Sequence, residues 1–72
     1  MSKFCFEQCI KKVIYETGLN QSQIAEKLGI SRPTFIRWKK HGHMVTVAAL
    51  EKLANLCDVH YDMVARWGRV DD

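Results

Sequence analysis

Hydrophobic residues recur every three or four positions along most of the chain, the spacing that places side chains on one face of an α-helix. Over the first such segment, from about Lys3 to Thr17, the residues that keep this spacing are Phe6, Ile10, Val13, Ile14 and Thr17. Polar residues separate them, and Gly18 follows as a residue that readily ends a helix. We therefore predict a first helix from about Lys3 to Thr17.

A second helical segment is shorter. Ile24, Ala25 and Leu28 share one face of a helix, and Gly29 follows as the residue best able to take a left-handed backbone. The helix should therefore run from about Gln21 to Leu28 and stop there.

Polar residues at two positions are suited to begin helices. Asn20 and Gln23 stand three apart, as in a capping box, where each side chain satisfies a backbone amide at the helix start. Ser31 can cap a further helix in the same way. Two helices separated by a tight turn are thus predicted, which is a helix-turn-helix.

The third helix is predicted from about Arg32 to His41, with Gly42 closing it. Pro33 is compatible with it, because the first turn has no intrahelical use for that amide. Phe35 and Trp38 stand three apart, and both should face inward.

Two further helices complete the pattern. Thr46 can cap one that ends near Asp58, and the other runs from about Tyr61 to Trp67. The residues expected in the core from these two helices are Val47, Leu50, Leu53, Ala54, Cys57, Met63, Val64 and Trp67. Met44 and Val45, just before Thr46, are more apolar than a loop requires, so we expect them to be covered. No strand alternation is found, and the prediction is an all-α, compact five-helix bundle forming a single helix-turn-helix domain over residues 1–72.

The charge of the chain is concentrated in one part. With 72 residues, 47% hydrophobic and 26% charged, the chain has the composition of one small globular domain, and its net charge is only +3. Between Glu26 and Glu51, however, no acid occurs. The cations in that interval are Lys27, Arg32, Arg37, Lys39 and Lys40. A positive field on one element is typical of a nucleic-acid surface.

Several other classes of protein are not favoured. No apolar run reaches the 18 or so residues of a membrane span, and the first residues lack the apolar core of a secretory signal, so we expect a cytoplasmic protein. Cys5, Cys9, Cys57 and His60 could be imagined as a zinc site, but their spacing lacks the short paired loops of structural zinc sites, and buried, reduced thiols are favoured instead. We expect no metal and no cofactor. No catalytic cluster or phosphate-binding loop can be placed, so we expect no enzyme.

Four segments together resemble the phage repressor and Cro family of helix-turn-helix regulators. They are residues 19–21 (Leu-Asn-Gln), 24–32 (Ile-Ala-Glu-Lys-Leu-Gly-Ile-Ser-Arg), 37–38 (Arg-Trp) and 50–54 (Leu-Glu-Lys-Leu-Ala). The positions diagnostic of that family are filled by Ile24, Ala25, Leu28, Gly29, Ile30, Phe35 and Trp38. The resemblance implies a lambda repressor-like DNA-binding domain, with the third helix entering the major groove of an operator and the second lying across the backbone.

The resemblance also implies site residues. The groove-facing positions are Ser31, Arg32, Pro33, Ile36, Arg37 and Lys40. Gln21 would meet a phosphate at the start of the second helix, while Lys39, Lys40 and His41 are suited to phosphates as positioning charges. The implied partner is double-stranded DNA, bound by a homodimer in a bacterial host.

One departure from the family leaves an alternative open. Ile36 stands where relatives usually carry a small polar residue, and with Pro33 it makes the expected DNA-reading face half apolar. The second hypothesis is therefore a small phage antirepressor or modulator, which uses the same surface to bind a partner phage repressor.

Overall fold

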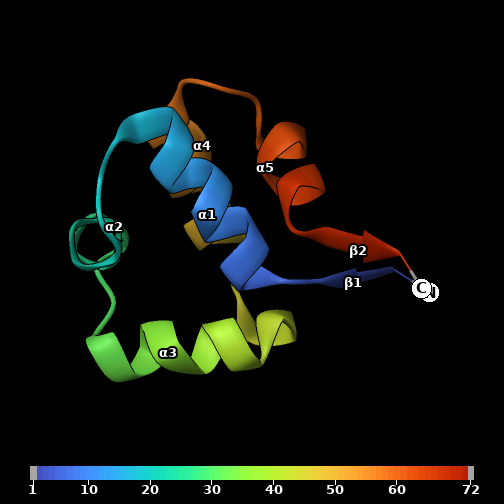
Figure 1. Ribbon diagram of the computed structural model, residues 1–72, viewed down its shortest axis with the longest axis horizontal. Helices are drawn as coiled ribbons and strands as arrows, with labels where there is room; N and C mark the ends of the chain where they lie inside the picture. Colours follow the sequence, from blue (N-terminus) through green and yellow to red (C-terminus); the bar gives the residue numbers. More distant parts are fainter. Residues whose placement is uncertain (1, 72) are drawn as a thin grey trace.

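The computed structural model describes residues 2–71, and in it the first helix occupies the middle of a five-helix arrangement (Figure 1). The helices are α1 (Phe6–Thr17), α2 (Gln21–Leu28), α3 (Arg32–Lys40), α4 (Val47–Cys57) and α5 (Tyr61–Trp67), with a single 3₁₀ turn η1 (Gly42–Met44) between α3 and α4. Helix α1 packs against α3, α4 and α5, while α2 packs against α3 and α4. The predicted all-α class and the number of helices are confirmed.

The core draws on every helix. Its buried members are Phe6, Cys9, Ile10, Val13, Ile24, Ala25, Leu28, Phe35, Trp38, Ala49, Leu50, Leu53, Ala54 and Val64. Helices α1 to α4 contribute buried residues three or four apart, and α5 contributes Val64. The periodicity of the sequence therefore identified the buried faces of α1 to α3 correctly. Ile14 and Ile30 pack half-buried against this core, as do Cys57 and Trp67.

The helix ends follow the capping signals of the sequence. Asn20 Oδ1 accepts from the backbone N–H of Gln23 at 2.8 Å, and Gln23 Oε1 accepts from the N–H of Asn20 at 2.9 Å, which confirms the capping box. Thr46 caps α4 by accepting from the N–H of Ala49 at 3.1 Å. Gly18, with φ of 76°, ends α1 in the left-handed conformation.

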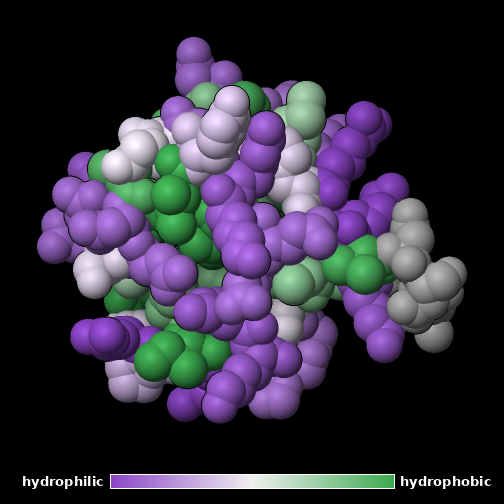
Figure 2. All heavy atoms as spheres, in the orientation of Figure 1, coloured by the Kyte–Doolittle hydropathy of each residue, from purple (hydrophilic) through white to green (hydrophobic). Residues whose placement is uncertain are grey.

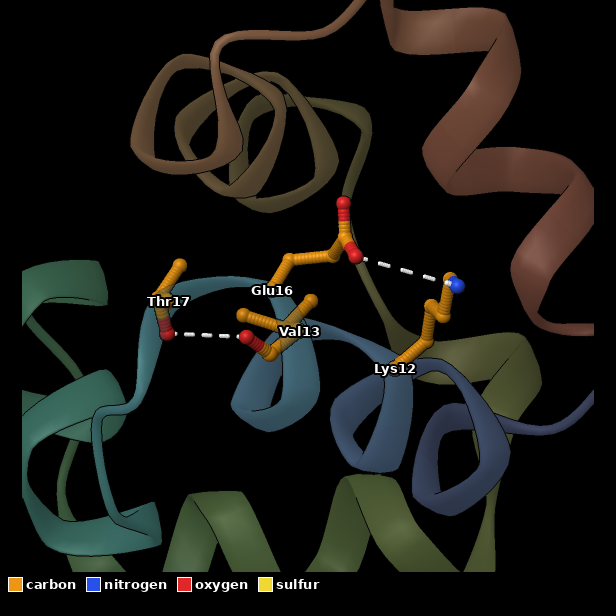
Figure 3. A network of polar contacts seen from close by, with 4 residues as sticks. All are labelled: Lys12, Val13, Glu16 and Thr17. Atoms are coloured by element: carbon orange, nitrogen blue, oxygen red, sulfur yellow. Dashed lines mark hydrogen bonds and ion pairs between the residues drawn. The ribbon is translucent and has the colours of Figure 1, made fainter.

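Two side-chain contacts hold the C-terminal half of α1 (Figure 3). The Thr17 hydroxyl donates to the carbonyl of Val13 at 2.8 Å, and Lys12 Nζ lies 3.8 Å from a Glu16 carboxylate oxygen. Lys12 Nζ also lies 5.8 Å from the ring centroid of Trp67 in α5, a cation–π contact that joins the outer side of α1 to the end of α5.

The prediction was wrong at the N-terminal end, where a strand replaces the first residues of the expected helix. Strand β1 (Ser2–Phe4) pairs antiparallel with β2 (Arg69–Asp71), with Lys3 opposite Val70. We call this pair the terminal ribbon. Helix α1 begins only at Phe6, because the N–H of Cys5 donates to the carbonyl of Gly68 at 2.6 Å rather than entering a helix.

Two glycines allow the terminal ribbon to approach the helices. A Cβ atom on Gly42 would overlap the backbone carbonyl of Phe4, and one on Gly68 would overlap the Phe4 ring. Gly42 was predicted to close α3, but the C-cap of this helix is His41. Helix α3 ends at Lys40 instead of His41, and Gly42 begins η1 at the place where β1 passes.

Three hydrophobic residues expected to be covered are exposed. Val47 is 58% exposed because it is the first residue of α4, and the buried side of that helix begins with Ala49 and Leu50. Met63 is 44% exposed on α5, where Val64 takes the core position. Met44 is 43% exposed in η1.

Candidate nucleic-acid interface

Helices α2 and α3 are joined by a three-residue turn. Gly29 has φ of 72°, and its N–H bonds to the carbonyls of Ala25 and Glu26. The N–H of Ile30 donates to the carbonyl of Ala25 at 3.1 Å, and Ser31 caps α3. The left-handed residue reverses the chain within one position, so the start of α3 lies close to the end of α2. This is the geometry of a helix-turn-helix.

Aromatic packing fixes the inner side of α3. Phe35 and Trp38 are buried, and their rings meet the ring of Phe6 edge to face, with centroids 5.3 Å and 5.5 Å apart. Edge-to-face pairs of this kind add stabilisation beyond the area they bury. Because both aromatic residues point at α1, the opposite side of α3 faces solvent.

The outer side of α3 carries most of the predicted site. The exposed residues there are Arg32, Pro33, Ile36, Arg37 and Lys40. In residues 2–71, no carboxylate forms an ion pair with any of the three cations among them. Three exposed cations on one helix, with no acid paired to them, make a surface that attracts a polyanion.

Gln21 and Lys39 come from different helices and meet. Lys39 Nζ donates to Gln21 Oε1 at 3.2 Å and lies 6.0 Å from the ring centroid of Phe35. Lys39 is half-buried by these contacts, so it is directed along the α2–α3 junction instead of straight outward. Gln21, accepting through its oxygen, keeps its amide N–H groups for an anion.

Ser31 stabilises the first turn of α3 through two hydrogen bonds to Thr34. Its hydroxyl oxygen accepts from the N–H of Thr34 at 3.3 Å and the hydroxyl donates to Thr34 Oγ1 at 3.0 Å. Both bonds hold the first turn of α3. Ser31 remains exposed, but its hydroxyl proton is already used within the helix start.

A groove of about 340 Å³ runs between α2 and α3 and includes residues that the sequence analysis did not single out. Its lining is Gln21, Ser22, Ala25, Glu26, Ile30, Arg32 and Phe35. Ser22 and Glu26 stand four apart on α2, and that spacing beside Gln21 was the signal that could have found them. Glu26 is the acid in this lining, and a carboxylate can accept from a cytosine amino group in the major groove.

The thiols are free and differ in exposure. Burial, with the neighbouring thiols of Cys57 and Cys5 adding to it, raises the pKa of Cys9 to about 12. Burial also raises the pKa of Cys57, with Glu16 as a second cause. Cys9 is therefore a protonated core residue at neutral pH, and its thiol points at the carbonyl of Val64, 3.6 Å away.

Neither a metal site nor a membrane span is found in the described part of the chain. Within residues 2–71, no group of three or more histidine, cysteine or acidic side chains is placed to hold a metal ion. His60 is instead the N-cap of α5, accepting at Nδ1 from the N–H of Asp62 at 3.2 Å. Over the same residues, none of the helices has the length and apolar character needed to cross a bilayer.

Comparison with known proteins supports the helix-turn-helix. A family model described as a homeodomain-like domain matches residues 9–41, slightly less than half of the chain, from within α1 to just beyond α3. No curated protein and no solved structure shows significant similarity to the chain. Homeodomains are three-helix variants of the helix-turn-helix in which the third helix reads DNA, and the matched segment spans α2, the turn and α3. The match supports a helix-turn-helix of the kind found in DNA-binding regulators, and it does not extend to the narrower phage repressor and Cro type.

Proposed function

We propose that this protein is a sequence-specific DNA-binding transcriptional regulator of phage or prophage type, acting as a Cro-like repressor. It would bind a two-fold operator as a homodimer in the cytoplasm of a bacterial host. The observation that carries the proposal is the outer side of α3. There Arg32, Arg37 and Lys40 are exposed beside a turn whose backbone geometry is that of a helix-turn-helix.

Each exposed residue has a distinct role in this proposal. The guanidinium groups of Arg32 and Arg37 can pair with O6 and N7 of guanine. Pro33 and Ile36 would contact thymine methyl groups, and Lys40 and Lys39 would neutralise phosphates without reading sequence. Gln21 would donate its amide N–H to a phosphate near the start of α2, with the hydroxyl of Ser31 setting the first turn of α3.

The test is the salt dependence of binding to the intergenic DNA that flanks the gene. The logarithm of the affinity should fall linearly with the logarithm of the salt concentration, and Lys40→Ala should reduce the slope by about one. Arg66→Ala removes one exposed cation from α5, a helix that lies apart from α3 (Figure 1), and should leave the slope unchanged. A flat salt response of the parent protein would remove the DNA-binding proposal.

A second function is favoured by one observation. Ile36 is 44% exposed on the outer side of α3, and a hydrophobic patch is visible among the hydrophilic side chains over that helix (Figure 2). With Pro33 beside it and arginine and lysine around it, Ile36 would form the apolar centre of an interface if a partner protein covered this side of α3. The alternative is that α3 binds a partner phage repressor and acts as an antirepressor.

Ile36→Ser separates the two functions. If α3 enters the major groove, the substitution removes only methyl contacts, so the preference at one base position should change by about 1–3 kcal/mol. If α3 binds a repressor, truncating the central apolar residue should cost about 2 kcal/mol or more. The measurement is the affinity of parent and variant for the DNA and for the repressor of the same prophage at one salt concentration. Loss of repressor binding, with negligible DNA binding by the parent, would establish the antirepressor.

A further inference from the structure

A hollow lies between the terminal ribbon and the last two helices, and we call it the ribbon hollow. It has a volume of about 350 Å³ and shares no lining residue with the groove between α2 and α3. Its walls come from β1, η1, α4, α5 and β2, so elements from both ends of the chain meet there. None of the residues assigned to DNA above belongs to its lining.

Much of this lining is apolar. Val47 and Leu50 stand three apart on α4, so they lie on one face of that helix. Tyr61 and Ala65 stand four apart on α5 and share a face in the same way. Val45, just before α4, also lines the hollow, and Val47 is 58% exposed. Apolar side chains that the sequence predicted to be covered are therefore open to a ligand here.

The terminal ribbon supplies an aromatic ring and a cation to the same hollow. Phe4 and Arg69 stand directly opposite each other in the antiparallel pair, so their side chains project from the same face of the ribbon. Both line the hollow. Gly42 allows β1 to pass close to η1, because a Cβ atom there would overlap the Phe4 carbonyl. The ribbon thus closes one side of the hollow.

The polar side chains of the hollow suit an anion. Lys3, His43, Arg69 and the phenol of Tyr61 belong to the lining, and no carboxylate does. Over residues 3–70, whose side chains the structure describes, the guanidinium of Arg69 forms no hydrogen bond or ion pair. Its N–H donors are therefore available beside an apolar surface. This combination favours an anion that carries an apolar body.

We propose that the ribbon hollow binds a small aromatic carboxylate. The ring would pack against Phe4 and Tyr61, since aromatic rings pair favourably in edge-to-face and offset arrangements. The carboxylate would accept two parallel hydrogen bonds from the Arg69 guanidinium, whose planar fork matches it. A volume of about 350 Å³ lies near the lower end for small-molecule pockets and suits one ring with a short acidic chain. Such a ligand would connect the terminal ribbon to α4 and α5, and its binding needs no DNA.

The experiment titrates the isotope-labelled full chain with sodium phenylacetate and follows the backbone amides by NMR. For a ligand of about ten non-hydrogen atoms, we expect a Kd on the order of 1 mM. Saturable shifts should concentrate at lining amides such as those of Val45, Ala65 and Arg69. Two matched ligands separate the parts of the chemistry, because phenylacetamide keeps the ring without the charge and acetate keeps the charge without the ring. Each should bind at least about tenfold more weakly than phenylacetate.

Two variants test the assigned contacts. Arg69→Gln should weaken phenylacetate binding about tenfold and leave phenylacetamide binding unchanged, because only the charged ligand uses the guanidinium. Val47→Asp brings a carboxylate to the hollow and should also weaken phenylacetate binding, while an acid in the first turn of α4 is compatible with that helix. Arg66→Gln removes an exposed cation of α5 that lies outside the lining, and this control should bind like the parent. Thermal melts establish that each variant is folded.

The outcomes decide for or against the ribbon hollow alone. Saturable binding of phenylacetate that weakens on Arg69→Gln, and not on Arg66→Gln, supports the site. The proposal is overturned if no saturable shifts appear at the lining amides, if acetate produces the same shifts, or if Arg69→Gln binds phenylacetate as tightly as the parent does. Because the titration contains no DNA, each of these results leaves the proposed DNA-binding function to its own test.

Discussion

The helix-turn-helix and the terminal ribbon are held in place by different kinds of contact. Helix α2, its turn and the start of α3 are set by residues within a few positions of one another, such as Asn20 with Gln23 and Ser31 with Thr34. The terminal ribbon joins β1 and β2, whose paired residues are more than sixty positions apart. It stays in place through Phe4, which lies against Gly42 and Gly68.

The difference shows which region should be the more robust. A turn defined by local capping and a left-handed glycine forms whenever its two helices form, whereas a two-stranded ribbon is marginal by itself and depends on packing. Gln8 adds to that packing, since its amide donates to the carbonyls of Trp67 at 2.8 Å and Arg69 at 3.3 Å. The ribbon should therefore detach under conditions in which the helix-turn-helix persists.

The largest effect is expected from Phe6→Ala, because Phe6 joins the two regions. It lies two residues after the end of β1, and its ring packs against the rings of Phe35 and Trp38 of α3. Truncating a fully buried phenylalanine costs about 3–5 kcal/mol, a large part of the free energy of unfolding of a domain this size. Urea unfolding followed by circular dichroism measures the loss.

Tyr15→Ala, at a residue 79% exposed on the same helix, should change stability by less than about 0.5 kcal/mol. Equal losses for the two variants would contradict this account of the core.

A smaller and more selective effect is expected from Gly42→Ala. The new methyl group would overlap the Phe4 carbonyl, and such overpacking costs about 1–3 kcal/mol. The chain can relieve it by releasing β1. Hydrogen exchange should then show lost protection at the N–H of Cys5, which bonds to Gly68, while the N–H of Ile30 in the turn keeps its protection. If the amide of Ile30 loses protection as well, the two regions are not independent.

The smallest effect of the three should come from Gly29→Val, which tests the turn alone. Space is available, since a Cβ there meets only Lys52 Nζ at 4.0 Å, so the cost arises from the left-handed backbone. A β-branched residue at φ of 72° should destabilise by about 1–2 kcal/mol. Gly29→Asn is the matched control and should cost less, because asparagine tolerates this conformation. Identical thermal melts for the valine variant and the parent would mean that the turn carries no such strain.

The same contrast explains what could be predicted from the sequence. The bounds of α2 and α5 and the caps at Asn20, Ser31 and Thr46 were predicted correctly, because their signals lie within one helical turn. The terminal ribbon was missed because each strand is only three residues long and neither shows alternation. The ribbon depends on pairing between strands at opposite ends of the chain, and on Gly42 and Gly68, which leave room for Phe4.

The candidate site shows a similar division. The exposure of Arg32, Ile36 and Arg37 follows from the helical period once Phe35 and Trp38 are placed inside. The contact of Lys39 with Gln21 does not, because it depends on the angle at which two helices meet. The roles of these residues toward DNA stay predictions. A hollow past the end of α3, lined by residues of β1, α3 and the start of η1, could not be predicted from the sequence, because it forms only where β1 passes beside η1.

The two tryptophans give the molecule a pair of built-in optical reporters. Trp38 is buried beneath Phe6 in the helix-turn-helix, while Trp67 lies half-buried at the end of α5, under Lys12 and next to the ribbon. A buried indole emits at shorter wavelength than one that meets water, so replacing either with phenylalanine leaves a single emitter that reports on one region. Fluorescence of the two single-tryptophan proteins can thus follow ribbon release and loss of the helix-turn-helix as separate spectral events, without an attached dye.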